Sequence, residues 1–402
     1  MGLRIFVACA VLLAACGEST NDGSGTGGTP GTGGTGGSGG GAGSGGTGGS
    51  DGGGVVSDLE VTTLIPGLDN PWDIAWLPNE TVLVTERSGP LSVYVDGVGA
   101  QPFTHLPDDL VASGEGGMLG LEVDPNFSNN GYVYVCMCSN RSGTNDVRLV
   151  RFTLETPDGG DVLDRADIVT DMPYSSGRHS GCRPRFGPDG YLWVGTGDAA
   201  IGTTPQDDGS LGGKVLRIDR DGAAAPGNPG GRRWFSKGHR NIQGMAFRAS
   251  DDLGVSAEHG PSVDDEVNLL VEGNFGWDPV GDPVPTDYDE SRPMTDLVKF
   301  PDAVEAIWST GSPTLAFSGA TFIEGNAWGD WDGVLAVATL KEQHLHIYFV
   351  TSTGEVTDDF RVINDRGRLR SPRQGPDVLL YITTDSGAGN GSVLKVTPVL
   401  LP

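Results

Sequence analysis

Basic residues are scarce in this chain. Its 402 residues include 26 lysines and arginines against 53 aspartates and glutamates, which gives a formal net charge of −27 at pH 7. Such an excess of negative charge repels nucleic-acid phosphates and anionic lipid headgroups. The composition therefore predicts no nucleic-acid partner and no peripheral site on an anionic membrane surface, and it favours solubility.

Long hydrophobic runs are also lacking, and the one short run lies at the N-terminus. Residues 5–15 are apolar and follow a single basic residue, Arg4. The run is too short to span a bilayer as a stable helix. It is typical of a secretory signal peptide, which we place at residues 1–15.

The end of this run, Leu13-Ala14-Ala15-Cys16, resembles the lipobox of bacterial lipoproteins. The resemblance implies cleavage before Cys16 and lipidation of its thiol, so that the chain meets the membrane only through an N-terminal lipid anchor. Gly17 resembles the residue found in lipoproteins sent to an outer membrane. We therefore expect an exported lipoprotein, anchored in the outer membrane and facing the periplasm or the cell surface. An ordinary small-residue cleavage site is the alternative interpretation.

Glycine, in contrast, is abundant after the predicted cleavage site. From Gly17 to Val56, 21 of 40 residues are glycine, and most of the others are Ser or Thr. Such a segment cannot bury a core and is typical of a flexible tether, with a root-mean-square reach of roughly 35 Å. We assign residues 16–56 to the lipidated cysteine and this tether. No second linker interrupts residues 57–402, which favours one large domain.

Cysteines are few. The sequence has five, and the three that follow the predicted lipidation site Cys16 are Cys136, Cys138 and Cys182. An oxidising compartment allows one disulfide among these three and leaves one thiol over. Cys136 and Cys138 are two residues apart in a strand-like run, too far apart to bond with each other. Any disulfide therefore has Cys182 at one end and either of the other two at its other end; three reduced, buried thiols are the equal alternative.

Helical periodicity is hard to find, whereas short strands between Gly, Pro, Asn and Asp are frequent. A unit made of a tight polar turn and an alternating apolar strand recurs six times, at intervals of about 45 to 80 residues. Repeats of this length predict an all-β fold, a six-bladed β-propeller of four-stranded antiparallel blades. The uneven spacing predicts long loops within 199–240 and 273–320, whereas a β-sandwich array would have shorter, more regular repeats. The six units span residues 77–86, 124–135, 187–194, 249–256, 331–337 and 375–382.

One of these units is flanked by an imidazole and a carboxylate. His179 lies in a loop of small residues before the unit, and Asp198 follows its strand directly. The two could meet at one end of a sheet, where the carboxylate would fix the tautomer of an imidazole general base. Taken alone, the stretch is explained as well by a loop histidine and a capping aspartate.

Two further loops are polar. The glycine-bounded loop 238–244 contains Arg240 and Asn241, and the loop 258–266 joins Gly260 and Pro261 to three acids that include Asp265. Carbonyl and carboxylate oxygens are hard ligands of the kind that Ca²⁺ prefers. The spacing is not that of an EF-hand, and a solvated acidic turn explains the second loop when it is considered alone.

Several basic residues gather near the end of this acidic chain. They suggest an anionic partner, and an organic polycarboxylate is the most specific one, because arginine binds carboxylates in a bidentate manner. Surface salt bridges, which contribute little to stability, are the alternative. The cluster consists of Lys341, Arg366, Arg368, Arg370 and Arg373.

Together these motifs resemble the soluble quinoprotein glucose dehydrogenases and aldose sugar dehydrogenases, also called glucose/sorbosone dehydrogenases. The resemblance extends from about residue 64 to residue 396, and six stretches occur in the order in which the family has them. Two departures are Ile242, where the family usually has proline, and Ser371, where it usually has aspartate. The six stretches are residues 115–127, 179–198, 212–218, 238–244, 258–277 and 368–377.

The resemblance implies a six-bladed propeller that holds pyrroloquinoline quinone (PQQ) over a Ca²⁺ ion. It implies that His179 is the base for the sugar C1 hydroxyl, that Asp198 orients it, and that Glu115 stands where relatives carry a glutamine near the base. Arg178 is an unusual neighbour that would lower the pKa of His179. The resemblance further assigns the quinone to Arg240, Asn241, Lys341, Arg368 and Arg370, and the metal to Gly260 and Pro261 with Asp265 in the same loop.

The expected function is therefore the oxidation of aldose sugars to lactones by hydride transfer to Ca²⁺-bound PQQ. The physiological electron acceptor, a cytochrome or a quinone, is not identified by the sequence. Two alternatives use the same scaffold. One is a non-catalytic extracellular binding propeller, and the other is a lactonase or hydrolase that uses the metal as a Lewis acid.

Overall fold

The computed structural model describes residues 54–95, 99–102, 107–155, 162–280 and 287–401. The predicted signal peptide, the lipidation site Cys16 and nearly all of the predicted tether lie outside the described residues. The first strand begins at Val55, two residues before the predicted start of the domain. None of the helices in the described part of the chain has the length and apolar composition needed to cross a lipid bilayer.

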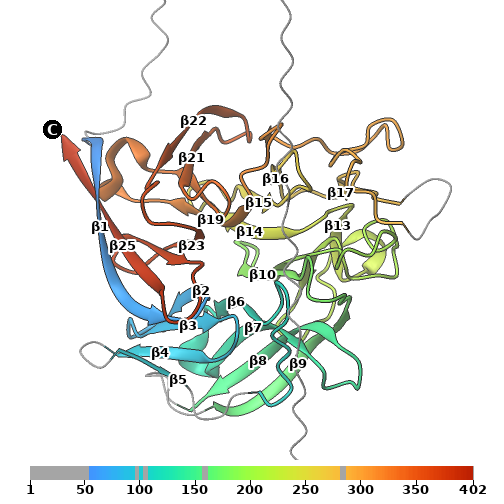
Figure 1. Ribbon diagram of the computed structural model, residues 1–402, viewed down its shortest axis with the longest axis horizontal. Helices are drawn as coiled ribbons and strands as arrows, with labels where there is room; N and C mark the ends of the chain where they lie inside the picture. Colours follow the sequence, from blue (N-terminus) through green and yellow to red (C-terminus); the bar gives the residue numbers. More distant parts are fainter. Residues whose placement is uncertain (1–53, 96–98, 103–106, 156–161, 281–286, 402) are drawn as a thin grey trace, which may run out of the picture. The chain divides into compact units, whose positions relative to one another are not determined.

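Six antiparallel sheets surround a common centre and form the predicted six-bladed β-propeller (Figure 1). Each innermost strand contacts the innermost strands of the two neighbouring sheets, and the last contacts the first, so the ring is closed. In chain order the innermost strands are β2 (Pro71–Trp76), β6 (Met118–Val123), β10 (Gly181–Phe186), β14 (Ile242–Phe247), β19 (Phe317–Ile323) and β23 (Leu369–Gln374).

The second strand of every sheet coincides with one of the six predicted turn-and-strand units. The polar turn of each unit joins the first strand of a sheet to the second, because Gly, Pro, Asn and Asp supply the backbone conformations that a tight reversal needs. The six-fold repeat is thus confirmed. The second strands are β3 (Val82–Glu86), β7 (Tyr132–Ser139), β11 (Leu192–Thr196), β15 (Gly254–Glu258), β20 (Val334–Thr339) and β24 (Leu380–Thr384).

The outer strands complete the sheets, and within the described ranges three short helices lie between strands. One sheet departs from the four-stranded pattern, because β17 adds to β13 in parallel as a fifth strand. The outer strands are β4 (Leu91–Val95), β5 (Gly99–Pro102), β8 (Asp146–Leu154), β9 (Val162–Met172), β12 (Lys214–Ile218), β13 (Trp234–Lys237), β16 (Glu266–Leu269), β17 (Gly273–Asn274), β18 (Trp308–Ser309), β21 (Leu345–Val350) and β22 (Val356–Val362). The helices are α1 (Phe127–Asn130), η1 (Pro229–Gly231) and η2 (Asn326–Trp331).

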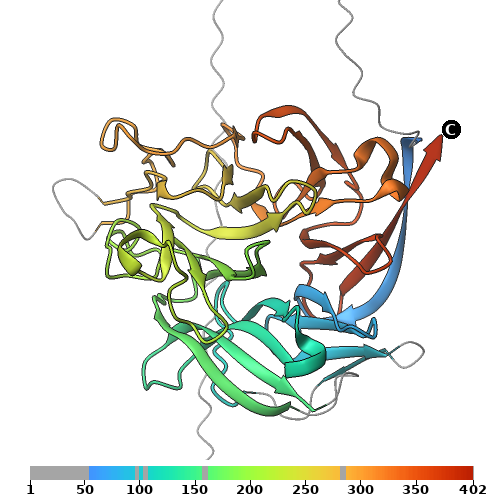
Figure 2. The ribbon, with the colours of Figure 1, turned by 180° about the vertical axis from the view of Figure 1, so that it is seen from behind.

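The two ends of the domain share the last sheet. Its three inner strands are β23, β24 and β25 (Gly391–Leu401), and its outermost strand is β1 (Val55–Leu68), from the start of the domain. The two pair antiparallel from Val55 opposite Leu401 to Leu68 opposite Gly391. Figures 1 and 2 show β1 and the C-terminal strand side by side at the rim. Backbone hydrogen bonds between the ends thus close the ring.

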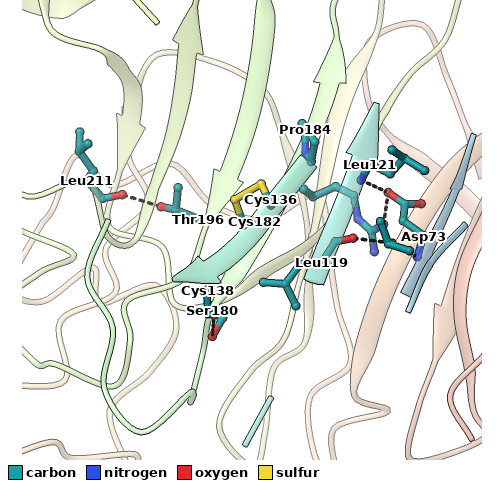
Figure 3. Close-up of a disulfide and its surroundings, with 12 residues drawn as sticks. Asp73, Leu119, Leu121, Cys136, Cys138, Ser180, Cys182, Pro184, Thr196 and Leu211 are labelled. Atoms are coloured by element: carbon teal, nitrogen blue, oxygen red, sulfur yellow. Dashed lines mark hydrogen bonds and ion pairs between the residues drawn. A yellow bond between two sulfur atoms is a disulfide. The ribbon is translucent and has the colours of Figure 1, made fainter. Parts of the chain in front are cut away.

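Apolar side chains fill the spaces between neighbouring sheets. Middle strands such as β7 are buried on both faces, which explains their nearly continuous runs of apolar residues. A disulfide joins Cys136 in β7 to Cys182 in β10 and so links the second sheet to the third, while Cys138 is free and buried (Figure 3). The structure thereby decides the pairing that the sequence left open.

The antiparallel order places two sets of loops at one end of the ring. These are the loops that precede the innermost strands and the loops that follow the second strands, as the pairing of Gly181 with Thr196 and of Leu369 with Thr384 shows. The six predicted tight turns lie at the opposite end. Every residue of the predicted site that the structure describes lies in or next to the two sets of loops at the first-named end.

Candidate active site

His179 lies in the turn that leads into β10. Its backbone has a φ of +47°, a left-handed conformation that is uncommon for a residue other than glycine. Its N–H donates a hydrogen bond to Glu115 Oε2 at 3.0 Å, and its carbonyl oxygen accepts one from Ala199 N at 3.3 Å. Glu115 therefore holds the backbone of the predicted base, and the side chain of His179 is 4% exposed.

Asp198, at the end of β11, accepts four hydrogen bonds in full burial. Its Oδ1 accepts from His179 Nδ1 at 2.8 Å and from Ala200 N at 2.7 Å. Its Oδ2 accepts from Trp277 Nε1 at 2.8 Å and from the Tyr288 hydroxyl at 2.6 Å. Four donors favour the ionised carboxylate. The proton of a neutral His179 is therefore on Nδ1, which leaves Nε2 as the basic atom.

Arg240 lies before β14 and faces that basic atom. Its Nη2 is 3.0 Å from His179 Nε2 and 3.3 Å from Glu290 Oε1, and its Nη1 donates to the carbonyl oxygen of His259 at 2.6 Å. The carbonyl oxygen of Arg240 accepts a hydrogen bond from Asp198 N at 2.8 Å. Hydrogen bonds therefore join the loops of the third and fourth sheets next to His179.

Arg240 forms the first cationic group of the site. The second consists of Arg368 and Arg370 and lies at the junction of the fifth and sixth sheets. Asp385, which follows β24, forms ion pairs with Arg368 at 3.0 Å and with Arg370 at 3.2 Å. Although burial opposes ionisation of this carboxyl, the two guanidinium groups hold the pKa of Asp385 well below its usual range. Arg368 Nη1 also donates to the carbonyl oxygen of Leu340 at 3.2 Å, next to the exposed side chain of Lys341.

The two cationic groups are connected. Arg370 Nη1 donates to Gln243 Oε1 at 3.0 Å, and Gln243 lies two residues after Asn241. Three buried polar atoms of the predicted cofactor residues have no hydrogen-bond partner among the described residues: Arg240 Nε, Arg370 Nε and Asn241 Oδ1. Unpaired buried polar groups are costly. Two unpaired guanidinium donors and one amide acceptor fit an anionic ligand that carries several polar groups.

The predicted metal loop follows β15. Gly260 N donates to Asp265 Oδ1 at 2.9 Å, and Asp265 Oδ2 accepts from Leu315 N at 2.6 Å and Ala316 N at 2.7 Å. Burial raises the pKa of Asp265 to about 6. Both oxygens of this carboxylate thus fix the loop that carries Gly260 and Pro261, so the carbonyl oxygens are the ligands that the loop can offer to a cation.

Side-chain ligands do not gather into a metal site. Among the residues that the structure describes, no group of three or more His, Cys, Asp or Glu side chains is arranged to hold a metal ion. A Ca²⁺ ion at this loop would need the carbonyl oxygens of Gly260 and Pro261, and that of Gly260 already lies 2.6 Å from His259 Nδ1. The calcium site stays a prediction.

Three residues of the site were not predicted from the sequence. Trp277 and Tyr288 both donate to Asp198, and Glu290 Oε1 bridges Arg240 and Arg178, the latter at 2.5 Å. All three lie in the long loop that the uneven repeat spacing predicts within 273–320. The uneven repeat spacing thus indicated an inserted loop, but no spacing rule identifies which side chains of the loop reach His179.

Two departures from the family pattern are accommodated by the structure. Ile242 is buried against Gly195, where an added Cβ atom would lie 2.3 Å from the Ile242 side chain. Arg370 takes its carboxylate partner from Asp385, so Ser371 is not needed for that role.

Fold and site together define a β-propeller that carries a buried His–Asp pair and two linked groups of arginines at one end of its ring. The family model of the glucose/sorbosone dehydrogenases matches residues 68–395, and the chain belongs to this family. It is therefore a sugar dehydrogenase, an oxidoreductase built on a six-bladed β-propeller.

Known relatives include enzymes and their structures. Aldose sugar dehydrogenase YliI of Escherichia coli is 32% identical over 361 residues, which cover 85% of this chain and 93% of that protein. Quinoprotein glucose dehydrogenase B of Acinetobacter calcoaceticus is 29% identical over 248 residues, or 53% of this chain and 51% of that protein. The solved PQQ-bound form of aldose sugar dehydrogenase from Streptomyces coelicolor has 26% identity and a TM-score of 0.69, and the match covers 85% of this chain and 98% of that chain.

Proposed function

We propose that this chain oxidises the C1 hydroxyl of aldose sugars to lactones with PQQ and Ca²⁺ as cofactors. The observation that carries the proposal is the buried His179–Asp198 pair, whose basic atom lies 3.0 Å from Arg240. The PQQ-bound relative and the quinoprotein relative support the choice of cofactor. When bound, PQQ would accept the hydride that leaves C1, and Ca²⁺ would stabilise the charge that develops on the quinone.

The cationic residues would hold the cofactor. Arg240 and Arg370 each have a buried Nε without a partner, and Asn241 has an unpaired amide oxygen. Arg368 shares Asp385 with Arg370 and adds positive charge, and Lys341 follows Leu340, whose carbonyl oxygen accepts a hydrogen bond from Arg368. A tricarboxylate fits this set because each guanidinium group can bind a carboxylate through two parallel hydrogen bonds.

His179 would act as the general base. Its Nε2 lone pair would take the proton of the C1 hydroxyl, and loss of that proton makes the carbon a better hydride donor. Asp198 then stabilises the imidazolium without itself taking the proton. Arg240 must move away from Nε2 before a sugar can approach, because its Nη2 occupies that position at 3.0 Å.

Reconstitution tests the proposal. The purified protein, incubated with PQQ and Ca²⁺, should reduce an artificial electron acceptor when an aldose is added. His179→Gln should abolish this reaction and largely keep the affinity for PQQ, since Arg240 loses its contact with the imidazole but keeps those with the His259 carbonyl oxygen and Glu290. His239→Gln, which changes a buried histidine one residue before Arg240, controls for general destabilisation. PQQ binding without sugar-dependent reduction across a broad panel of aldoses would favour a binding propeller instead, and lactone hydrolysis would favour the hydrolase.

We further propose that the enzyme is a lipoprotein held at the outer membrane through Cys16, with a cytochrome or a membrane quinone as electron acceptor. The lipobox-like sequence before Cys16 supports the anchor. Replacement of Cys16 by alanine should release the protein from the membrane fraction. Equal amounts of membrane-bound protein for the wild type and for Cys16→Ala would contradict the anchor.

A further inference from the structure

The hydroxyl group of Tyr288 contacts both members of the His179–Asp198 pair. It donates to Asp198 Oδ2 at 2.6 Å and is 3.2 Å from His179 Nδ1. The ring also lies against the imidazole, with centroids 5.8 Å apart. Burial raises the pKa of Tyr288, and the neighbouring Asp198 raises it further, so the phenol stays a neutral donor.

A donor at this position weakens the base. When His179 takes a proton, the imidazolium is stabilised by the negative charge on Asp198. Trp277 Nε1 and the Tyr288 hydroxyl donate hydrogen bonds to Asp198 Oδ2 and so partly neutralise the same negative charge. Each of them therefore reduces the stabilisation that remains for the imidazolium and lowers the proton affinity of Nε2.

The segment that carries Tyr288 is built to place it there. Tyr288 forms an isolated antiparallel bridge with Val280, and Asp289 N donates to the carbonyl oxygen of Pro279 at 2.8 Å. Asp289 Oδ1 then accepts from Ser291 N at 3.0 Å and from Ser291 Oγ at 2.6 Å, which closes a turn. This segment belongs to the long loop of the fourth sheet, whereas the His–Asp pair belongs to the third.

We propose that Tyr288 is a positioning residue that sets the tautomer and the base strength of His179 through Asp198. This inference rests on the proposed function, in which His179 is the base. The other charged or titratable groups around the imidazole are unchanged when only the Tyr288 hydroxyl is removed. They are Glu115 before β6, Arg178 in the same turn, Arg240 before β14, His259 after β15 and Glu290 beyond Tyr288.

Tyr288→Phe removes the hydroxyl and keeps the ring. In the pH profile of kcat/KM, the midpoint of the acid limb should move up by about 0.5 to 1 pH unit, because Asp198 then stabilises the imidazolium more strongly. The plateau value of kcat should fall about 3- to 10-fold as the imidazole loses one of its restraints. The Kd for PQQ should stay within about twofold, because Tyr288 does not belong to the cationic groups. Tyr191→Phe is the matched control, since the Tyr191 ring contacts Arg217 at the opposite end of the sheet.

A profile that coincides with that of the wild type would overturn the proposal, and so would a loss of activity without a shift of the acid limb. NMR titration of the His179 imidazole, assigned through His179→Gln, measures the same shift without substrate. A higher pKa in Tyr288→Phe supports the role of Tyr288, and an unchanged one refutes it. A wild-type protein that oxidises no aldose would refute the proposed function alone, and the NMR titration would still decide the role of Tyr288.

Discussion

Gly197 lies so close to His179 that a Cβ atom at position 197 would be 1.8 Å from the His179 carbonyl oxygen. Non-bonded heavy atoms do not approach so closely, so any other residue at position 197 must displace the turn that carries His179. The neighbouring Gly202 lies in the same loop region, and its nearest neighbour would be 3.4 Å from an added Cβ atom, an ordinary contact.

Gly197→Ala should therefore lower kcat by about 100-fold, since a shift of the base by about 1 Å has effects of that order. Steady-state kinetics with a saturating aldose measure the change. Gly202→Ala should remain within about threefold of the wild type, because its Cβ atom has room. Similar activities of the two variants would show that the turn tolerates displacement.

The disulfide between β7 and β10 should stabilise the domain. It closes a separation of 46 residues, and loss of such a crosslink costs about 2–4 kcal/mol. The double variant Cys136→Ser/Cys182→Ser should show this loss in denaturant unfolding, whereas Cys138→Ala should cost less because it breaks no crosslink. Peptide mapping should find Cys136 linked to Cys182, with Cys138 alkylated only after unfolding. A linked Cys138 would contradict the pairing.

Asp385 should contribute more to the free energy of unfolding at neutral pH than at acid pH. Its folded-state pKa lies below the unfolded value of 3.8 because Arg370 and Arg368 outweigh the cost of burial. Its stabilising contribution is therefore complete above pH 3.8 and is lost as the pH falls through the folded-state pKa. Asp385→Asn should cost about 3 kcal/mol at pH 7 and less at pH 3, measured by urea unfolding. Asp365→Asn, which breaks an exposed pair with Arg366, should change stability by less than about 1 kcal/mol.

Glu266 should have the opposite pH dependence. Burial, with Glu258 nearby, raises the pKa of Glu266 well above its value of 4.5 in the unfolded chain. Above pH 4.5 the folded state therefore holds a proton that the unfolded state has released, so stability falls as the pH rises from 4.5 toward the folded-state pKa. Glu266→Gln should flatten this fall by at least about 1 kcal/mol. An unchanged slope, equal to that of the exposed variant Glu272→Gln, would show that Glu266 ionises normally.

The repeating part of the fold could be predicted because its signals are local. Each turn needs Gly, Pro, Asn or Asp, and each second strand needs an apolar run, so the six units are visible in the sequence. The placement of β1 could not be predicted in this way. Val55 pairs with Leu401, and no local pattern encodes a pairing between strands so far apart in the chain.

The same distinction holds at the site. His179 and Asp198 were predicted because they flank one hairpin, in which Gly181 and Thr196 pair directly. Asp385 likewise follows the second strand of its sheet, one residue after β24, and its N–H donates to the carbonyl oxygen of Arg368, so the same argument applied to the last repeat would have found it. Tyr288 had no such signal, because a long loop brings it to another sheet.

The pairing of β1 with β25 has a consequence for synthesis. Among the strands that the structure describes, β1 is synthesised first, yet the strand with which it pairs, β25, is synthesised after all the others. Until then the sixth blade lacks its outer strand, and two long unpaired edges face the solvent, where they are open to aggregation. The nascent domain should therefore depend on protection, by chaperones or by delayed export, until both strands are available.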